Sequence, residues 1–276
     1  MAVDIAGGVV QENNMINEDK NNCKQKTLAE LQTFSEFYEY LSDSVYWQLT
    51  KGTYKHLNYR AYIYSSMGNS LLSISDILTK NKFNDAYQLF RGYYDTVILD
   101  IYSALYIEKN MKAEKMVIEE IDNWVQGKTK LPSIKNMIEY IQKEQSLKHI
   151  NETLLKDGRY KHIRTRCDDH IHYNFYQYLL MNISQMQLEI PSKYYEELLN
   201  EIDDIFILHF AYTFTINPLY MMSSDYIDSL DMGIQPEEGT QYLVAPFIQE
   251  VFDQVVKSKR HDVARVILET TCMKLE

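Results

Sequence analysis

The sequence predicts an all-α protein, built as a long antiparallel bundle of helices with additional C-terminal helices. Only nine Gly and five Pro occur among 276 residues, which is too little turn punctuation for a protein made of sheets. Apolar residues also recur at steps of three and four over long stretches, as the buried face of a helix requires. Because 45% of the residues are hydrophobic, the chain can bury a substantial core.

The first part of the chain contains three long periodic segments behind a polar start. Residues 1–25 include Gly7-Gly8 and show little periodicity, so we expect a flexible N-terminal lead. Core helices are then expected over 28–45, 59–78 and 84–105. Since the breaks between them are short, successive helices should pack as antiparallel neighbours.

Further helices are expected along the rest of the chain. The pattern predicts helical segments over 112–126, 133–143 and 159–182, and a long helix between Pro191 and Pro218. It then predicts a helix start at Pro236-Glu237-Glu238, a kink at Pro246, and a terminal helix that is capped by Asp262 and ends near Leu275. The chain therefore divides into the lead, a helical bundle over 26–182 and a C-terminal extension over 190–276 that packs on the bundle.

Charge and cysteine usage restrict the class of partner. A net charge of −11 repels phosphates, so a nucleic acid or an anionic membrane would need a local basic patch. One basic cluster consists of Lys156, Arg159, Lys161, Arg164 and Arg166, with Asp157 as an opposing acidic residue. The same cluster could also be a solvated turn at the surface. Three separated cysteines without metal-type spacing favour a cytoplasmic protein with no metal or cofactor. The sequence also lacks a secretion signal and an apolar span, so we expect no membrane association.

Residues 164–174 concentrate more polar chemistry than any other stretch. On a straight helix they flank an apolar stripe of Tyr160, Ile163, Cys167, Ile171 and Tyr178. Two polar ladders at four-residue steps lie beside the stripe: Arg164, Asp168 and His172 on one side, and Arg166, His170 and Asn174 on the other. Such a ladder can tune an imidazole for proton transfer near neutral pH, while a guanidinium clamps a phosphate. The same residues could instead form intrahelical salt bridges that support a bundle or a dimer.

At these residues the chain resembles the HEPN superfamily, whose signature is an Arg followed after four to six residues by a His. Arg166 with His172 satisfies this spacing, as does Arg164 with His170. The likeness covers about residues 28–180.

The resemblance extends to an earlier helix. The segment from Asn81 to Arg91 is similar to the part of HEPN-like, abortive-infection-type proteins that leads into an Arg-bearing helix. Asp95 lies one turn beyond Arg91, so the two side chains could form a buried ion pair.

The resemblance implies a metal-independent endoribonuclease, of the kind that acts as a toxin or an antiviral-defence effector. A 2′-hydroxyl would attack the adjacent phosphate, a His would transfer the proton, and an Arg would stabilise the charge on the phosphate. The catalytic residues would be Arg166, His172, His170 and Arg164, with support from Asp168, Asp169, Asn174, Arg91 and Asp95, and with RNA bound by Lys156, Arg159 and Lys161. The implied partners are a second protomer that shares the cleft, RNA, and an antitoxin or regulatory protein.

Two other functions are consistent with the same segment. A non-catalytic protein could keep the HEPN-like scaffold for dimerisation or partner binding, which Cys167 favours because the family commonly has Asn, Asp or His after the Arg. A metal-dependent phosphohydrolase could use the cluster Asp168, Asp169, His170 and His172. Arg166 and His172 lie about 120° apart on a straight helix. A kink, a helix that starts at about Arg166, or a site shared across a dimer would bring them together.

Overall fold

The computed structural model describes residues 5–50, 58–111, 117–182 and 190–276, with side chains in the first of these ranges described over 22–46. The described residues are mostly helical and contain no strand, which confirms the all-α prediction. Two isolated bridges, Met222 with Val244 and Leu243 with Lys274, join extended backbone near the C-terminus.

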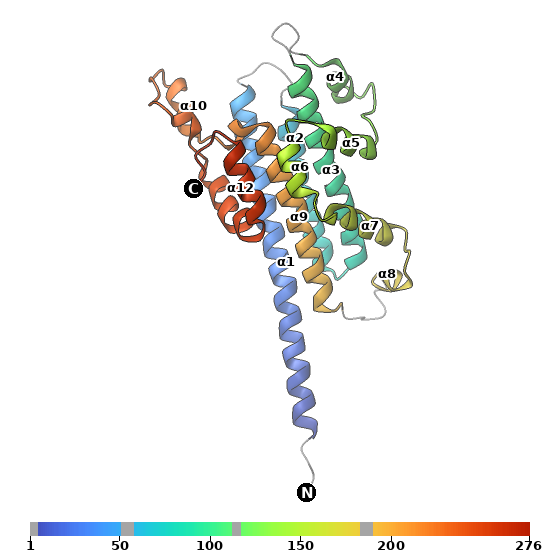
Figure 1. The fold of residues 1–276 in the computed structure, drawn as a ribbon. Helices are drawn as coiled ribbons and strands as arrows, with labels where there is room; N and C mark the ends of the chain where they lie inside the picture. The colour runs from blue at the N-terminus through green and yellow to red at the C-terminus, as the bar shows by residue number, and fades with distance from the viewer. Residues whose placement is uncertain (1–4, 51–57, 112–116, 183–189) are drawn as a thin grey trace.

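Four long helices form the centre of the molecule (Figure 1). They are α1 (Ile5–Thr50), α2 (Tyr59–Thr79), α3 (Phe83–Asn110) and α9 (Ser192–Ile216). Both α1 and α3 contact α2 and α9, so the four helices close around one core. α1, α2 and α3 alternate in direction along the bundle, as the short connections predict.

Shorter helices cover this bundle on two sides. One group consists of α4 (Glu119–Val125), α5 (Ile134–Lys143), α6 (Lys148–Leu154), α7 (Arg159–Ile171) and α8 (Tyr176–Leu180). The C-terminal group consists of η1 (Pro218–Met221), α10 (Ser224–Asp231), η2 (Thr240–Tyr242), α11 (Pro246–Val251), η3 (Phe252–Lys257) and α12 (His261–Thr270). α5 and α7 pack on α3, whereas α11 contacts α1 and α12 contacts α6 and α9. α7 and α8 therefore lie on the opposite side from α10 and α12 (Figure 1).

The helical periodicity correctly identifies most of the core. Phe34 of α1 is fully buried, and its ring stacks on Phe206 of α9 with centroids 3.9 Å apart. Two residues expected in the core are partly outside it, because they lie at the edge of the apolar stripe: Tyr62 is 64% exposed and Leu89 is 38% exposed. Most large aromatic side chains are thus used to pack helices together, which is the usual role of tyrosine at such spacing.

Helix ends differ from the sequence prediction more than helix positions do. α1 begins at Ile5, within the expected N-terminal lead, because an established helix extends at little cost per residue. α6, which follows Leu147, was not predicted. The segment at Pro236 is irregular and turns at Gly239, where φ is 84°, so the expected helix start there is wrong. The helix lies earlier, at α10, where the Ser223 side chain accepts a hydrogen bond from the Asp225 N–H.

One proline, one carboxylate and one shortened helix also differ from expectation. Pro246 opens α11 at its first turn instead of kinking a longer helix, because its missing N–H is not needed there. Asp262 lies in the first turn of α12, whose N-cap is Arg260 and whose last residue is Thr270. The expected helix over 112–126 is reduced to α4, and residues 112–116 lie outside the described residues.

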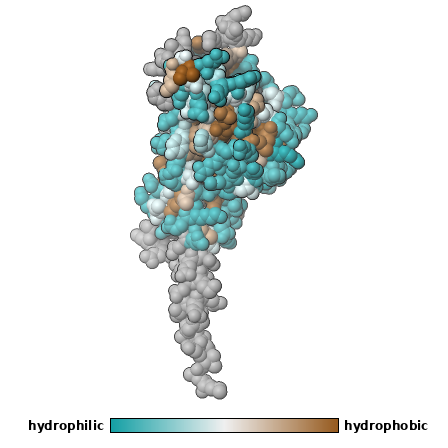
Figure 2. Space-filling view, turned by 90° about the vertical axis from the view of Figure 1, so that its left-hand side faces the viewer, coloured by the Kyte–Doolittle hydropathy of each residue, from teal (hydrophilic) through white to brown (hydrophobic). Residues whose placement is uncertain are grey.

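The outer surface of the C-terminal group is mainly hydrophilic, with small separate hydrophobic patches (Figure 2). Within the described ranges, no helix has the length and apolar character needed to cross a membrane. The helices pack against one another through the core that α1, α2, α3 and α9 share.

Candidate functional site

α7 carries the polar segment and lies between α3 and α9. Its apolar stripe is buried as expected at Tyr160, Ile163 and Cys167. At the next turn the buried position is taken by His170, which is 1% exposed, while Ile171 is half-buried. His170 thus belongs to the core side of the helix and not to a polar ladder.

α7 ends at Ile171, which breaks the helix expected over 159–182. The Asn174 N–H donates to the Asp169 carbonyl at 3.0 Å and the Tyr173 N–H to the His170 carbonyl at 3.5 Å, a pattern that closes a helix C-terminus. Tyr173 adopts a left-handed conformation with φ of 50°. A short helix, α8, restarts after the turn.

The predicted ladder of Arg164, Asp168 and His172 is not formed. Arg164 Nη1 instead donates to Asp95 Oδ1 on α3 at 3.0 Å, and Asp168 Oδ1 accepts from Arg91 Nε, also on α3, at 3.0 Å. Arg91 also pairs with Asp95, as its spacing predicted. These four side chains join α3 to α7 through alternating charges, because α3 offers closer partners than the next turn of α7 does.

Arg166 faces the other neighbour, α9. Its Nη1 lies 2.6 Å from Glu197 Oε2, and its Nε lies 2.9 Å from Glu201 Oε1. The hydroxyl of Tyr87 on α3 donates to Glu201 Oε2 at 2.9 Å. Burial raises the pKa of the Glu201 carboxyl to about 7, in spite of the Arg166 charge. The sequence reasoning missed both glutamates, although their four-residue spacing on α9 could have identified a polar strip.

His170 is enclosed by aromatic rings. It stacks on Tyr87 with centroids 3.9 Å apart and on Tyr178 with centroids 3.8 Å apart. Its Nδ1 lies 2.8 Å from Asn84 Oδ1, so Nδ1 carries the proton and donates it. Burial, with a contribution from the Arg166 charge, lowers the pKa of His170 to about 4. The ring is therefore neutral near pH 7 and shielded from a substrate.

This burial predicts a specific pH dependence. A His whose folded pKa is about 4, against 6.5 in the unfolded chain, stabilises the fold above pH 6.5, and this contribution is lost as the pH falls toward 4. Between pH 7 and pH 5 the wild type should lose about 2 kcal/mol of unfolding free energy that His170→Phe does not lose. Urea unfolding of both proteins at the two pH values measures this difference. If the wild type and His170→Phe differ in unfolding free energy by the same amount at pH 7 and at pH 5, the predicted pH dependence is wrong.

His172 is the exposed histidine of the predicted pair. It is the C-cap of α7, and among the described residues its ring makes no hydrogen bond or ion pair. Asn174 is also exposed, and its Nδ2 donates to Asp169 Oδ1 at 2.7 Å. Arg166 and His172 are therefore not brought together within one protomer, since Arg166 is held against α9.

Most of the predicted basic patch is neutralised. Lys156 pairs with Asp262 at 2.6 Å, and Arg159 pairs with Asp157 at 2.6 Å and with Asp204 at 2.5 Å. With Arg164 and Arg166 also paired, Lys161 is the member of this patch that is exposed and has no ion pair among the described residues. α12 supplies one of these carboxylates and α9 another, which is why the sequence alone suggested a basic surface.

A polar cleft lies between α7, α8 and α9. It has a volume of about 430 Å³, and its lining includes Arg166, Glu197, Lys193, Tyr178 and Tyr194. His162, which the sequence reasoning did not select, also lines it. His162 is exposed and lies one turn before Arg166 on the same face of α7.

The residues proposed for a metal site are separated by their partners. Asp168 binds Arg91, Asp169 binds Asn174, and His170 is buried between two rings. Across the part of the chain that the structure describes, no group of three or more His, Cys, Asp or Glu residues could hold a metal ion. The arrangement thus offers no support for the phosphohydrolase alternative.

The structure also contains a buried polar network that the sequence reasoning missed. Arg60 on α2 donates from Nε and Nη2 to both oxygens of Asp100 on α3, at 2.9 and 2.8 Å. His209 Nε2 on α9 lies 3.1 Å from Asp100 Oδ2, and its Nδ1 lies 2.9 Å from the Tyr38 hydroxyl on α1. Although burial disfavours its charge, Arg60 and the His209 hydrogen bond hold the pKa of Asp100 below its usual value. This network (Arg60, Asp100, His209 and Tyr38) joins all four central helices.

Comparison with protein-family models, with curated proteins and with solved structures finds no significant match for this chain.

Proposed function

We propose that this chain is a HEPN-type helical protein that acts by self-association, through a surface formed by the turn after α7 and by α8. The proposal is carried by the exposure of four side chains that we call the α8 surface: Tyr173 at 39%, Phe175 at 51%, Tyr176 at 75% and Leu179 at 42%. α8 buries none of its own residues. Grouped, exposed aromatic side chains are typical of an interface.

A second copy of the chain is the partner that this region suits. The adjoining cleft carries both charge signs, Arg166 and Lys193 against Asp169 and Glu197. A two-fold interface places the same patch on both sides, so it needs groups of both signs to be complementary to itself. The HEPN-type assignment rests on the Arg166 and His172 spacing and on the long antiparallel helices, and it implies a cleft shared by two protomers.

Backbone conformation at Tyr173 gives further support. A non-glycine residue with φ of 50° is uncommon and costs free energy, and here it carries an exposed aromatic side chain. Since Gly or Asn usually occupies this helix-closing position, a Tyr there is consistent with a side chain that is used in contacts.

The expected result in solution is a dimer of about 65 kDa, twice the 32.7 kDa of the chain. Tyr176→Asp should give the monomer mass, because a charge would be buried at the centre of the interface. Light scattering after size exclusion measures both proteins at micromolar concentration. Tyr62→Asp is the control, since Tyr62 is 64% exposed on α2. A monomeric wild type, or equal dissociation of both variants, would refute self-association through the α8 surface.

RNA cleavage is the second candidate function, and the cleft between α7 and α9 favours it. His162 and Arg166 face this cleft beside Tyr178 and Tyr194, and aromatic rings can stack on single-stranded bases. Self-association through the α8 surface would place the end of a second α7 beside the cleft, where His172 could complete a site. A role as a toxin or defence effector, with an antitoxin or regulatory partner in the cytoplasm, would follow from such an activity.

The test uses single-stranded RNA and purified protein with excess chelator. In the catalytic hypothesis the wild type leaves a cyclic phosphate end, and His172→Ala and His162→Ala each lower the cleavage rate by roughly two to four orders of magnitude. His149→Ala is the control, because His149 lies on α6 and is exposed. No cleavage by the wild type would exclude this function for the RNA tested and leave self-association standing. Activity that appears only with added manganese would support the metal-dependent alternative.

A further inference from the structure

A mainly apolar cavity lies at the end of the bundle where α2 begins and where α3 and α9 end. Its volume is about 460 Å³, within the usual range for small-molecule sites (roughly 300–1,000 Å³). The start of α2, the end of α3, the turn from α9 into η1, and α10 all contribute to its wall. Ala104, Ile216 and Met222 are buried members of this wall, whereas Met111 and Leu219 are exposed. The cavity therefore has a buried part within the bundle and an exposed edge.

Arg60 belongs to the buried wall and has one nitrogen that the described residues do not use. Its Nε and Nη2 donate to Asp100, whereas its Nη1 makes no hydrogen bond with a described residue. Other polar atoms without a partner have no accessible surface, but Nη1 is not one of these, so the 4% of the Arg60 side chain that stays accessible includes it. Because Arg60 lines the cavity, Nη1 can donate a hydrogen bond to a group that enters it.

A neutral oxygen is the acceptor that suits Arg60. The guanidinium already pairs with both oxygens of Asp100, and burial lowers the pKa of His209, so these three groups together carry no net charge near pH 7. A carboxylate at Nη1 would bury a second negative charge close to Asp100 without a second cation, which costs free energy. The carbonyl oxygen of a ligand would satisfy Nη1 without adding a charge.

The exposed edge of the cavity carries a carboxylate. Glu108 lines the cavity and lies on α3 two turns beyond Asp100, which is roughly 12 Å along the helix at 1.5 Å per residue. Glu108 forms no ion pair with a described residue, and the adjacent Lys109 binds Glu144. Partial burial and the charge of Glu144 raise the pKa of the Glu108 carboxyl. A cationic group of a ligand would therefore find an unpaired negative charge at this edge.

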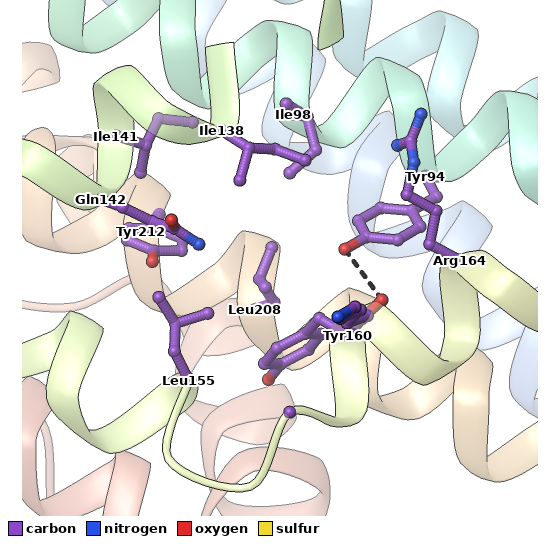
Figure 3. A pocket seen from close by; sticks show the side chains of 12 residues that line it. Tyr94, Ile98, Ile138, Ile141, Gln142, Leu155, Tyr160, Arg164, Leu208 and Tyr212 are labelled. Carbon is purple, nitrogen blue, oxygen red and sulfur yellow. Dashed lines mark hydrogen bonds between the residues drawn. The ribbon is translucent and has the colours of Figure 1, made fainter. Parts of the chain in front are cut away.

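The cavity beside α7 differs in its buried polar groups (Figure 3). It has a volume of about 290 Å³ and lies between α3, α5, α7 and α9. The hydroxyls of Tyr94 and Tyr212 donate to the Tyr160 carbonyl and to Asn151 Oδ1. The Tyr160 hydroxyl has no accessible surface. The tyrosines of that wall thus have no hydroxyl donor left for a ligand, whereas Arg60 keeps one nitrogen for it.

We propose that the cavity at the end of the bundle binds a small amine that has an apolar body and a neutral carbonyl at its far end. The carbonyl oxygen accepts a hydrogen bond from Arg60 Nη1, the body lies against the apolar wall, and the ammonium pairs with Glu108. The α8 surface lies near the other end of α3, where Asn182, close after α8, donates to Asp85. The proposed site therefore does not depend on self-association.

Titration of the full chain with 4-(aminomethyl)benzamide, followed by NMR of the methionine methyl groups, tests the proposal. The amide and the ammonium of this probe lie at opposite ends of a rigid ring. Met111 and Met222 line the cavity, so their methyl resonances should shift on binding. The expected dissociation constant is on the order of 1 mM or below, given the small size of the probe.

Three analogues separate the contributions of the two ends. Benzylamine lacks the amide, benzamide lacks the ammonium, and 4-(aminomethyl)benzoate has a carboxylate in place of the amide. Each should bind roughly tenfold more weakly than 4-(aminomethyl)benzamide, because each loses one of the two polar contacts or adds a buried charge.

Two variants assign the residues. Glu108→Gln should weaken binding of 4-(aminomethyl)benzamide roughly tenfold and leave benzamide unaffected. Glu238→Gln is the control, because Glu238 is exposed and does not line the cavity. The double variant Arg60→Met with Asp100→Leu keeps an apolar wall without the donor, so it should bind 4-(aminomethyl)benzamide no more tightly than benzylamine. Thermal unfolding shows whether each variant is folded.

Several results would overturn the proposal. These are unshifted Met111 and Met222 methyl resonances in the wild type, tighter binding of the benzoate than of the amide, or equal loss of affinity in Glu108→Gln and Glu238→Gln. If the double variant does not fold, the comparison of the amide with benzylamine on the wild type decides the role of Arg60, and equal affinity of these two probes would contradict it.

Discussion

Replacing Asp100 with alanine is expected to lower the free energy of unfolding by about 3 to 5 kcal/mol, since it removes one partner of a buried ion pair. Asp100 is fully buried, and the Arg60 side chain that it binds is 4% exposed. Without the carboxylate, the guanidinium would remain charged in the core, and the imidazole of His209 would lose its acceptor. Urea unfolding followed by circular dichroism at pH 7 measures the loss.

Two comparisons make this expectation specific. Asp76→Ala on α2 is the control, because Asp76 is exposed, and its effect should stay within about 0.5 kcal/mol. The double variant Arg60→Met with Asp100→Leu should cost less than Asp100→Ala alone, since neither charge is then left unpaired. An Asp100→Ala protein as stable as the Asp76→Ala control would show that the network does not support the bundle.

Phe206→Ala is expected to cost about 3 to 5 kcal/mol, by leaving a cavity between α9 and α1. The Phe206 ring is fully buried, stacks on Phe34 and meets the edges of Phe37 and Tyr38. Rigid aromatic neighbours from a second helix cannot close such a space fully, so the lost contacts are not recovered.

The matched comparison is Tyr62→Ala, which removes an equally large ring from the surface. Because Tyr62 is 64% exposed, its replacement should change the unfolding free energy by about 0.5 kcal/mol or less. Thermal and urea unfolding of both variants, measured side by side, provide the check. Similar losses in the two variants would mean that the contact between α1 and α9 contributes little to stability.

The sequence pattern predicts helices well where one face is continuously apolar. Phe34 and Tyr38 on α1, and Phe90 and Val97 on α3, are buried as their spacing requires. It predicts helix ends less well, because an end depends on hydrogen bonds to residues outside the periodic segment. The turn at Tyr173 is an example, since nothing in the composition there distinguishes it from continued helix.

The candidate site shows a sharper division. Sequence alone located the charged segment on a helix with a buried apolar stripe, and it anticipated the Arg91 and Asp95 pair, because these properties depend on neighbours within one helix. It also placed His170 and Arg166 on one polar ladder, whereas His170 is buried between Tyr87 and Tyr178.

The partner of each charge was decided only by the tertiary structure. Arg166 binds Glu197 and Glu201, and Lys156 binds Asp262, more than a hundred residues away. Electrostatic pairing depends on distance in space, and a local pattern contains no distances between helices. The sequence by itself therefore determined the helices and the presence of an unusual polar segment. Which of its side chains are neutralised, buried or left exposed was determined by the packing of α7 against α3 and α9.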